Sequence, residues 1–420
     1  MRPRFAFFGL AVFFTGCNAL LGIESGEFVE PPAASPDGAT EGGLDATGDA
    51  PRDARSDGTV PPSEGGLVDA KPDVVEAGAS DADAAAPDAG PDADAGGGCG
   101  DLQTDPHNCG TCGHDCLGGA CALGACQPYV LADLGTNDLR ALALGATDVF
   151  WTNATTNQLQ TTKKTSVNGA AETVVTIAPH TFADEISCAG AHVYFGEIVT
   201  DGKHRVARAL QTDREAGSET VADNLAQPIN VVAADGTRTV WNELLPTGSV
   251  FRCSAIPCSA PLDVVGTDSF PQNLAVGNGR IAWSSLTSKD IKVAAGAGTG
   301  TKIGAGANSI SAIVLLADTL VYADRGIGVV AIDLLTNTPR PPVATDVNIE
   351  FITADPDGAT IWYLNVTTFA SKLVHVNSTS GGPVTATTAL KSPRALAADD
   401  KRVYWLDTVN NQNRVMGLAK

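Results

Sequence analysis

The sequence predicts an all-β protein: a seven-bladed β-propeller closed by an N-terminal outer strand, preceded by a disordered acidic linker and a small disulfide-rich module. Three observations predict this. A strand–turn–strand pattern that ends on an aromatic residue recurs seven times after Leu139. Six cysteines cluster within 28 residues just before the repeats, and the chain ahead of them is rich in Ala, Asp, Gly and Pro.

The spacing of the repeats identifies them as propeller blades. The aromatic residue recurs every 39 to 46 residues, which is the period of blades built from four strands each. The seven aromatic residues are Trp151, Phe195, Trp241, Trp283, Tyr322, Tyr363 and Trp405. We therefore expect each repeat to form one antiparallel sheet of the ring.

A polar residue stands two places after each aromatic residue: Asn153, Glu197, Glu243, Ser285, Asp324, Asn365 and Asp407. With this residue the repeat resembles the YWTD type of β-propeller, most closely at residues 149–153 and 403–407. In that family the polar residue stabilises the fold, and six blades are usual, so a count of seven is a departure. The resemblance implies an architecture and not an activity.

The ring needs one strand from a distant part of the chain. After Arg394 the sequence has room for three strands, so the seventh blade lacks its outer strand. Residues 129–134 resemble the outer strands of other repeats and are predicted to supply it. Pairing the two ends would leave no free edge in the ring, and deleting Met416 onward should open it.

The N-terminal residues are typical of an export signal. Arg2 and Arg4 precede a short apolar run, which predicts a signal peptide over residues 1–16. The run ends in Phe14-Thr15-Gly16-Cys17, which resembles the lipobox of bacterial lipoproteins. The resemblance implies lipidation of Cys17, a membrane anchor and location in the cell envelope at the outer membrane, facing the periplasm or the exterior. Signal-peptide cleavage without lipidation is the alternative.

Residues 17–98 are predicted to form a disordered tether after the lipidated cysteine. From Glu24 to Gly98 there are 18 acidic residues and three basic ones, a net charge of −15 out of −21 for the whole chain. Such a segment cannot bury enough apolar surface to offset its ordering entropy. The acidity belongs to this segment, and no basic face for nucleic acid remains.

Residues 99–127 are predicted to form a cysteine-rich module, followed by the propeller over residues 128–420. The segment contains six cysteines: Cys99, Cys109, Cys112, Cys116, Cys121 and Cys126. The sequence around them resembles the cysteine-rich module of plant stigma-specific secreted proteins. Similar modules occur in bacterial surface lipoproteins. An even count in an exported, Gly-rich segment favours three disulfides, with fifteen connectivities open. The alternative is zinc, because Cys109 and Cys112 form a CxxC pair beside His107 and His114.

Two further cysteines, Cys253 and Cys258, flank Pro257 in the third repeat. A turn between two strands would bring them into bonding reach, so we expect a disulfide. Cys188 lies in an apolar strand, which favours a buried, inert thiol over a nucleophile.

Chemistry, if present, is expected where the innermost strands open on the axial channel. Aligning the repeats predicts a channel-mouth column of polar residues: Arg140, Glu185, Asn230, Asn273, Ser311, Glu350 and Arg394. Four of them carry oxygen ligands of the kind that calcium takes, namely Glu185, Asn230, Asn273 and Glu350. The arrangement resembles the central calcium of propeller lactonases. Structural ion pairs explain the same column without a metal, and we favour them.

Other catalytic patterns are absent from the sequence: it holds no GxSxG, HExxH, phosphate loop or dinucleotide fingerprint. We therefore favour binding over catalysis and expect no cofactor, with calcium as the alternative. The predicted role is an exported lipoprotein whose propeller binds a protein, peptide or polysaccharide. The alternative is a calcium-dependent hydrolase or lyase acting at the channel mouth.

Overall fold

The computed structural model describes residues 99–420 except 178–181, 200–201, 244, 259–261, 297, 369 and 380. The predicted signal peptide (1–16), the lipidation site Cys17 and the tether (17–98) lie outside the described residues. Within the described part of the chain, no helix combines the length and the apolar character that crossing a membrane requires.

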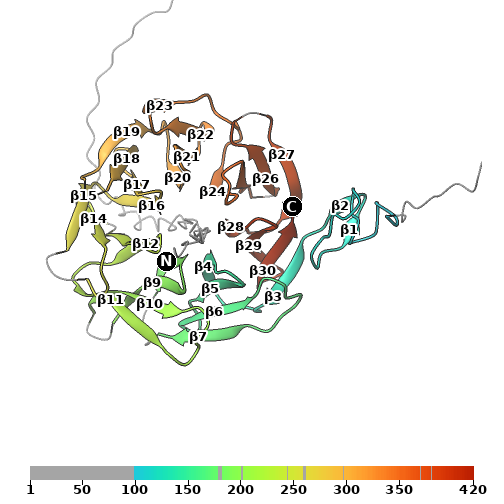
Figure 1. Ribbon diagram of the computed structural model, residues 1–420, viewed down its shortest axis with the longest axis horizontal. Coiled ribbons are helices and arrows are strands. Elements are labelled where there is room, and N and C mark those ends of the chain that lie inside the picture. The colour runs from blue at the N-terminus through green and yellow to red at the C-terminus, as the bar shows by residue number, and fades with distance from the viewer. Residues whose placement is uncertain are drawn as a thin grey trace, which may run out of the picture. The chain divides into compact units, whose positions relative to one another are not determined.

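Seven four-stranded antiparallel sheets form a ring (Figure 1), so the predicted seven-bladed propeller is confirmed. Blade 1 comprises β4 (Leu139–Leu144), β5 (Asp148–Asn153), β6 (Gln158–Lys163) and β7 (Glu172–Thr176). Blade 2 comprises β8 (Phe182–Ala189), β9 (His192–Ile198), β10 (His204–Leu210) and β11 (Ser218–Leu225). Blade 3 comprises β12 (Ile229–Ala234), β13 (Thr239–Glu243), β14 (Gly248–Cys253) and β15 (Asp263–Asp268).

The chain continues round the ring in the same order. Blade 4 comprises β16 (Pro271–Gly277), β17 (Arg280–Ser285), β18 (Asp290–Ala295) and β19 (Thr301–Ala305). Blade 5 comprises β20 (Ile310–Leu315), β21 (Thr319–Asp324), β22 (Gly328–Asp333) and β23 (Thr338–Pro339), and blade 6 comprises β24 (Ile349–Ala354), β25 (Thr360–Asn365), β26 (Ser371–Asn377) and β27 (Val384–Leu390). Blade 7 comprises β28 (Arg394–Ala398), β29 (Arg402–Val409), β30 (Gln412–Ala419) and β3 (Tyr129–Asp133).

The recurring aromatic residues form the core of the blades. All seven lie on the second strand of their sheet and are at most 4% exposed. The first strand of each sheet adds buried apolar residues beside the aromatic residue, so every blade presents buried side chains to its neighbours. Burial of these large side chains is the main force that holds the ring together.

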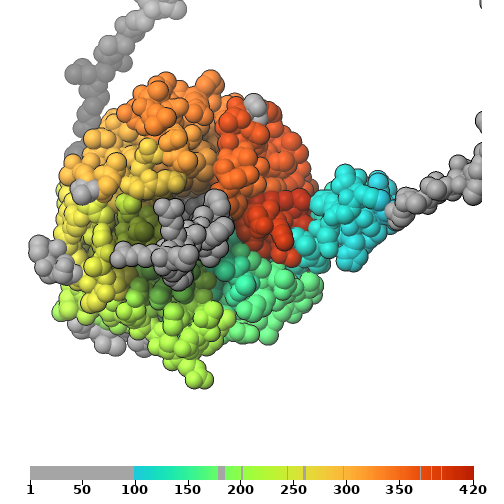
Figure 2. All heavy atoms as spheres, in the orientation of Figure 1, coloured from blue at the N-terminus to red at the C-terminus, as the bar shows by residue number. Residues whose placement is uncertain are grey.

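The outer strand of blade 7 is β3, as predicted. It pairs antiparallel with β30, with Tyr129 opposite Gly417 and Val130 opposite Met416. A Cβ atom at Gly417 would lie 2.5 Å from Leu131 Cδ1, so the glycine leaves room for the Leu131 side chain to pack closely on β30. Figure 2 shows the green sector of blade 1 beside the red sector of blade 7, so the two ends of the propeller segment meet at this seam.

The cysteine-rich module contains a two-stranded hairpin, β1 (Cys121–Ala122) and β2 (Ala125–Cys126). Three disulfides join its six cysteines: Cys99–Cys112, Cys109–Cys121 and Cys116–Cys126. Cys109 and Cys112 thus take different partners, which disfavours the zinc alternative. Cys253 and Cys258 form the disulfide predicted in blade 3, and Cys188 is buried.

Two polar contacts join the module to blade 7. His114 Nε2 lies 2.6 Å from the carbonyl oxygen of Lys420, and Arg402 Nη2 donates to the carbonyl oxygen of Leu117 at 3.3 Å. The module therefore contacts the same blade that β3 completes.

Candidate binding site

A β-bulge recurs in the innermost strand of each blade, where the predicted channel-mouth column lies. The pairing register shifts by at least one residue there in all seven sheets. In each blade one residue of the innermost strand pairs with the recurring aromatic residue, and five members of the column lie two places before it: Arg140, Asn230, Ser311, Glu350 and Arg394. Glu185 and Asn273 lie only one place earlier, so the seven residues do not share one register.

Two members of the column connect neighbouring blades through the backbone. The Asn273 amide nitrogen donates to Ile310 O and to Ser284 Oγ, both at 2.9 Å, and the side chain is fully buried. The Ser311 hydroxyl donates to Ile349 O of the next blade. These side chains therefore stabilise the seams between blades.

Three charged members of the column, Arg140, Glu350 and Arg394, take part in ion pairs. Asp138 lies between the two arginines at the closure, 3.1 Å from Arg140 Nε and 3.7 Å from Arg394 Nη1. Glu350 pairs with Arg325. Burial raises the pKa of Glu350, and the Arg325 guanidinium offsets part of that rise. This agrees with the ion-pair interpretation of the column.

The four predicted calcium ligands do not form one assembled set. Glu350 is engaged by Arg325, and Asn273 is fully buried and offset from Asn230 and Glu350 in register. Glu185 is 3% exposed and is offset from Asn230 and Glu350 in register. A calcium site needs six to eight oxygen atoms converging on one point, so the geometry gives this ion no ready ligand shell at these residues.

The polar residues that follow the aromatics are structural, as the sequence predicts. Asp324 accepts hydrogen bonds from the backbone N–H groups of Ala307, Asn308 and Gly326. Asp407 likewise accepts from Ser392 and Thr408 at 2.9 Å. Each carboxylate ties the turn after the second strand to the loop that enters the blade.

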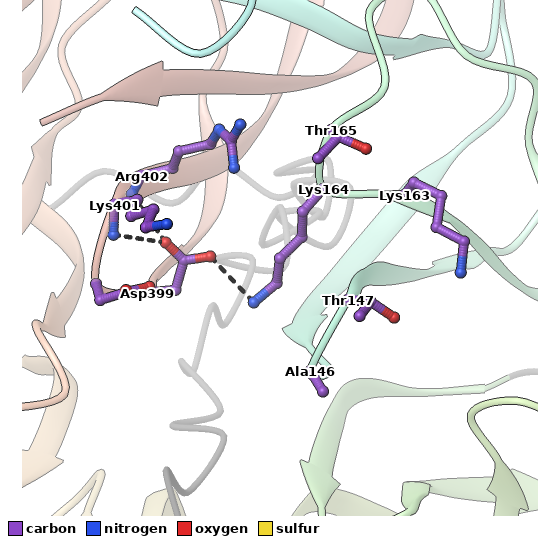
Figure 3. A pocket seen from close by; sticks show the side chains of 9 residues that line it. Ala146, Thr147, Lys163, Lys164, Thr165, Asp399, Lys401 and Arg402 are labelled. Carbon is purple, nitrogen blue, oxygen red and sulfur yellow. Dashed lines mark hydrogen bonds and ion pairs between the residues drawn. The ribbon is translucent and has the colours of Figure 1, made fainter. Parts of the chain in front are cut away.

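A pocket lies at the seam between blades 7 and 1 and was not predicted. Its volume is about 460 Å³, within the range of small-ligand sites. Turns of both blades line it, and Figure 3 shows the side chains of Lys163 and Lys164 on one side and the turn of Asp399 on the other. The lining residues are Ala146, Thr147, Lys163, Lys164, Thr165, Asp399, Asp400, Lys401 and Arg402.

Asp399 holds the two sides of this pocket together. Its carboxylate lies 3.0 Å from Lys164 Nζ across the seam, and it accepts backbone hydrogen bonds from Lys401 and Arg402 at 2.9 and 2.8 Å. Burial alone would raise the pKa of Asp399, but the Lys164 ammonium and these donors outweigh it and leave the pKa below its usual value.

Comparisons with known proteins support the fold alone. No family model matches the chain, and no curated protein matches it. The WD40 β-propeller domain of Doa1 superimposes with a TM-score of 0.53 at 11% identity, covering 69% of this chain and 96% of that one. A nidogen/laminin complex gives a TM-score of 0.37 at 12% identity, covering 50% and 78%, and the designed Ika8 protein gives 0.47 at 12% identity, covering 70% and 100%.

Proposed function

We propose that the protein is an exported cell-envelope lipoprotein, anchored through Cys17, whose rigid propeller binds an extracytoplasmic ligand. The disulfides carry the export part of this proposal. All eight cysteines expected to pair do so among the described residues, and such density is typical of proteins that fold in oxidising compartments.

The fold and the polar contacts of the channel-mouth column support the binding part of the proposal. A closed propeller presents turns from seven similar sheets on a scaffold that changes little, and this architecture is typical of binding proteins. Five of the seven residues of the channel-mouth column form ion pairs or contacts between blades. The pocket between blades 7 and 1 is therefore the site on which we place ligand binding.

Mass spectrometry of the mature protein tests the anchor. We expect Cys17 to be the N-terminal residue and to carry acyl chains, and a Cys17→Ser variant to lose both the lipid and membrane association. Cys188→Ser is the matched control, because it removes a buried cysteine remote from the signal. An unmodified N-terminus, or cleavage at another residue, would contradict the proposal.

A further inference from the structure

The pocket between blades 7 and 1, which we call the seam pocket, has an excess of positive charge. Its lining includes four basic residues and two acidic ones: Lys163, Lys164, Lys401 and Arg402 against Asp399 and Asp400. Asp399 is already engaged by Lys164, by two backbone N–H groups and by the Tyr404 hydroxyl at 3.1 Å. Asp399 and Lys164 thus neutralise each other, and Lys163 pairs with Asp148 at 2.9 Å. Lys401 and Arg402 against Asp400 still leave a positive excess, which favours an anion.

Arg402 adds a buried positive charge to this lining. The residue is 7% exposed, and its Nη2 donates to a carbonyl oxygen, that of Leu117, at 3.3 Å. Its Nε atom is buried without a hydrogen-bond acceptor among the described residues, although its charge helps to lower the pKa of the Asp115 carboxyl. A buried guanidinium with an unsatisfied donor is stabilised by a further anion.

The seam pocket is also strongly polar. Ala146 is its one apolar lining residue, so the pocket lacks the aromatic and aliphatic wall that apolar ligands need. The exposed side chains of Thr147, Thr165 and Asp400 offer hydroxyl and carboxylate groups to a ligand. A carboxylate in the lining disfavours a multiply charged anion and suits ligand hydroxyl groups, which can donate to it.

We propose that the seam pocket binds an acidic saccharide, with a uronate carboxylate held by the basic side chains and sugar hydroxyls held by Thr147, Thr165 and Asp400. This inference rests on the proposed binding function and names its ligand class. Lys163 and Lys401 are the exposed cations of the pocket, so they are the residues that would meet the ligand carboxylate first.

Isothermal titration calorimetry of the full mature chain tests this with three probes. The first two are methyl β-D-glucuronide and methyl β-D-glucoside, which differ in the carboxylate group, and the third is inorganic phosphate. We expect the glucuronide to bind about tenfold more tightly than the glucoside, since a charge-assisted hydrogen bond is worth that much. Binding should weaken as salt is added, because the basic side chains are partly exposed.

Lys163→Gln and Lys401→Gln should each weaken glucuronide binding by about two- to fivefold. Lys302→Gln is the matched control: Lys302 pairs with Asp290 in blade 4 and is 57% exposed, as Lys163 pairs with Asp148 and is 56% exposed. The control should bind the glucuronide like the unaltered protein.

Four results would overturn the proposal. Equal binding of the two glycosides would show that the ligand carboxylate makes no contribution. Phosphate binding as tight as glucuronide binding would show that the pocket recognises negative charge and not a saccharide. Equal losses of glucuronide affinity in Lys163→Gln and Lys302→Gln would show that the glucuronide does not bind at the seam pocket. Absence of binding for all three probes would show that the pocket is not a site for this ligand class. Lipid on Cys17 is measured separately, so failure here is distinguishable from failure of the proposed export and anchoring.

Discussion

Blades 6 and 7 have the same four-stranded sheet but are built from different parts of the chain. Blade 6 is continuous, from β24 to β27. Blade 7 takes its outer strand from the beginning of the propeller segment, and Arg414 and Asp133, which pair across β30 and β3 at 2.9 Å, are 281 residues apart in sequence. Sheet geometry thus does not depend on chain continuity, whereas closure of the ring depends on one pairing.

This difference concentrates several interactions at blade 7. The loop-closure entropy of a long chain segment grows slowly with its length, so distance in sequence costs only a few kcal/mol. Buried residues of both partners offset it: Leu131 and Val415 are 0% exposed. The cysteine-rich module and the seam pocket add further contacts at blade 7.

The largest effect is expected from a chain that ends at Val415. Such a chain loses the residues opposite Tyr129 and Val130 and the buried side chain of Leu418. Because β29 and β3 would then have partly unpaired edges, we expect the cooperative thermal transition to disappear. Circular dichroism on heating and limited proteolysis measure this, and a transition retained within a few degrees would show that closure does not depend on residues 416–420.

Removing the Cys116–Cys126 disulfide should unfold the module and loosen blade 7. A module of this size depends on its disulfides, and losing one costs such small domains about 2–5 kcal/mol. In a Cys116→Ser, Cys126→Ser variant, hydrogen exchange should rise in residues 99–127 and in β29 and β30, while blade 6 keeps its protection.

The matched control is Cys253→Ser with Cys258→Ser, which opens a disulfide between cysteines five residues apart in blade 3. Its effect on exchange should stay within that blade. Equal protection of blade 7 in the two variants would indicate that the module does not support the closure.

The aromatic period made the blades and the closing strand predictable from the sequence. The register of the innermost strands could not be predicted, because the residue types do not reveal where a β-bulge lies. Glu185 and Asn273 are polar like the residues aligned with them, yet each lies one place nearer to the residue that pairs with the aromatic. Disulfide connectivity was also open, since fifteen pairings satisfy six cysteines.

The seam pocket was missed for a topological reason. Its charged turns are visible in the sequence, as Lys163-Lys164 and as the run Asp399-Asp400-Lys401-Arg402. Each alone is typical of a solvated turn. Only the closure brings these turns, from opposite ends of the propeller segment, to the two sides of one pocket.

Leu131→Ala and Leu373→Ala compare the two blades at equal burial. Both side chains are 0% exposed, one on β3 and the other on β26 of blade 6. Each change should lower the free energy of unfolding by about 2–5 kcal/mol, as cavities of this kind do. We expect hydrogen exchange to rise in both blades 7 and 1 for Leu131→Ala, but in blade 6 and its neighbours for Leu373→Ala. The same exchange pattern in both variants would mean that the closure opens no more readily than an interior blade.

The smallest effect concerns the ion pair across the seam, Asp399–Lys164. Because the folded-state pKa of Asp399 lies below its usual value, the pair stabilises the fold above the unfolded-state pKa of about 4. That stability is lost as pH falls through the folded-state pKa. Asp399→Asn should therefore cost about 1–3 kcal/mol near pH 7 and clearly less near pH 3, as measured by denaturant unfolding at the two values.

Asp290→Asn is the control within a single blade. Its partner Lys302 lies on the adjacent strand at 2.6 Å, and the Asp290 side chain is 19% exposed against 15% for Asp399. Because Asp290 has one cationic partner at the rim of blade 4, whereas Asp399 also accepts two backbone N–H groups at the seam, the control should cost less. If Asp399→Asn costs as much near pH 3 as near pH 7, the loss comes from packing of the turn, and the charge at the seam does not distinguish blade 7 from the continuous blades.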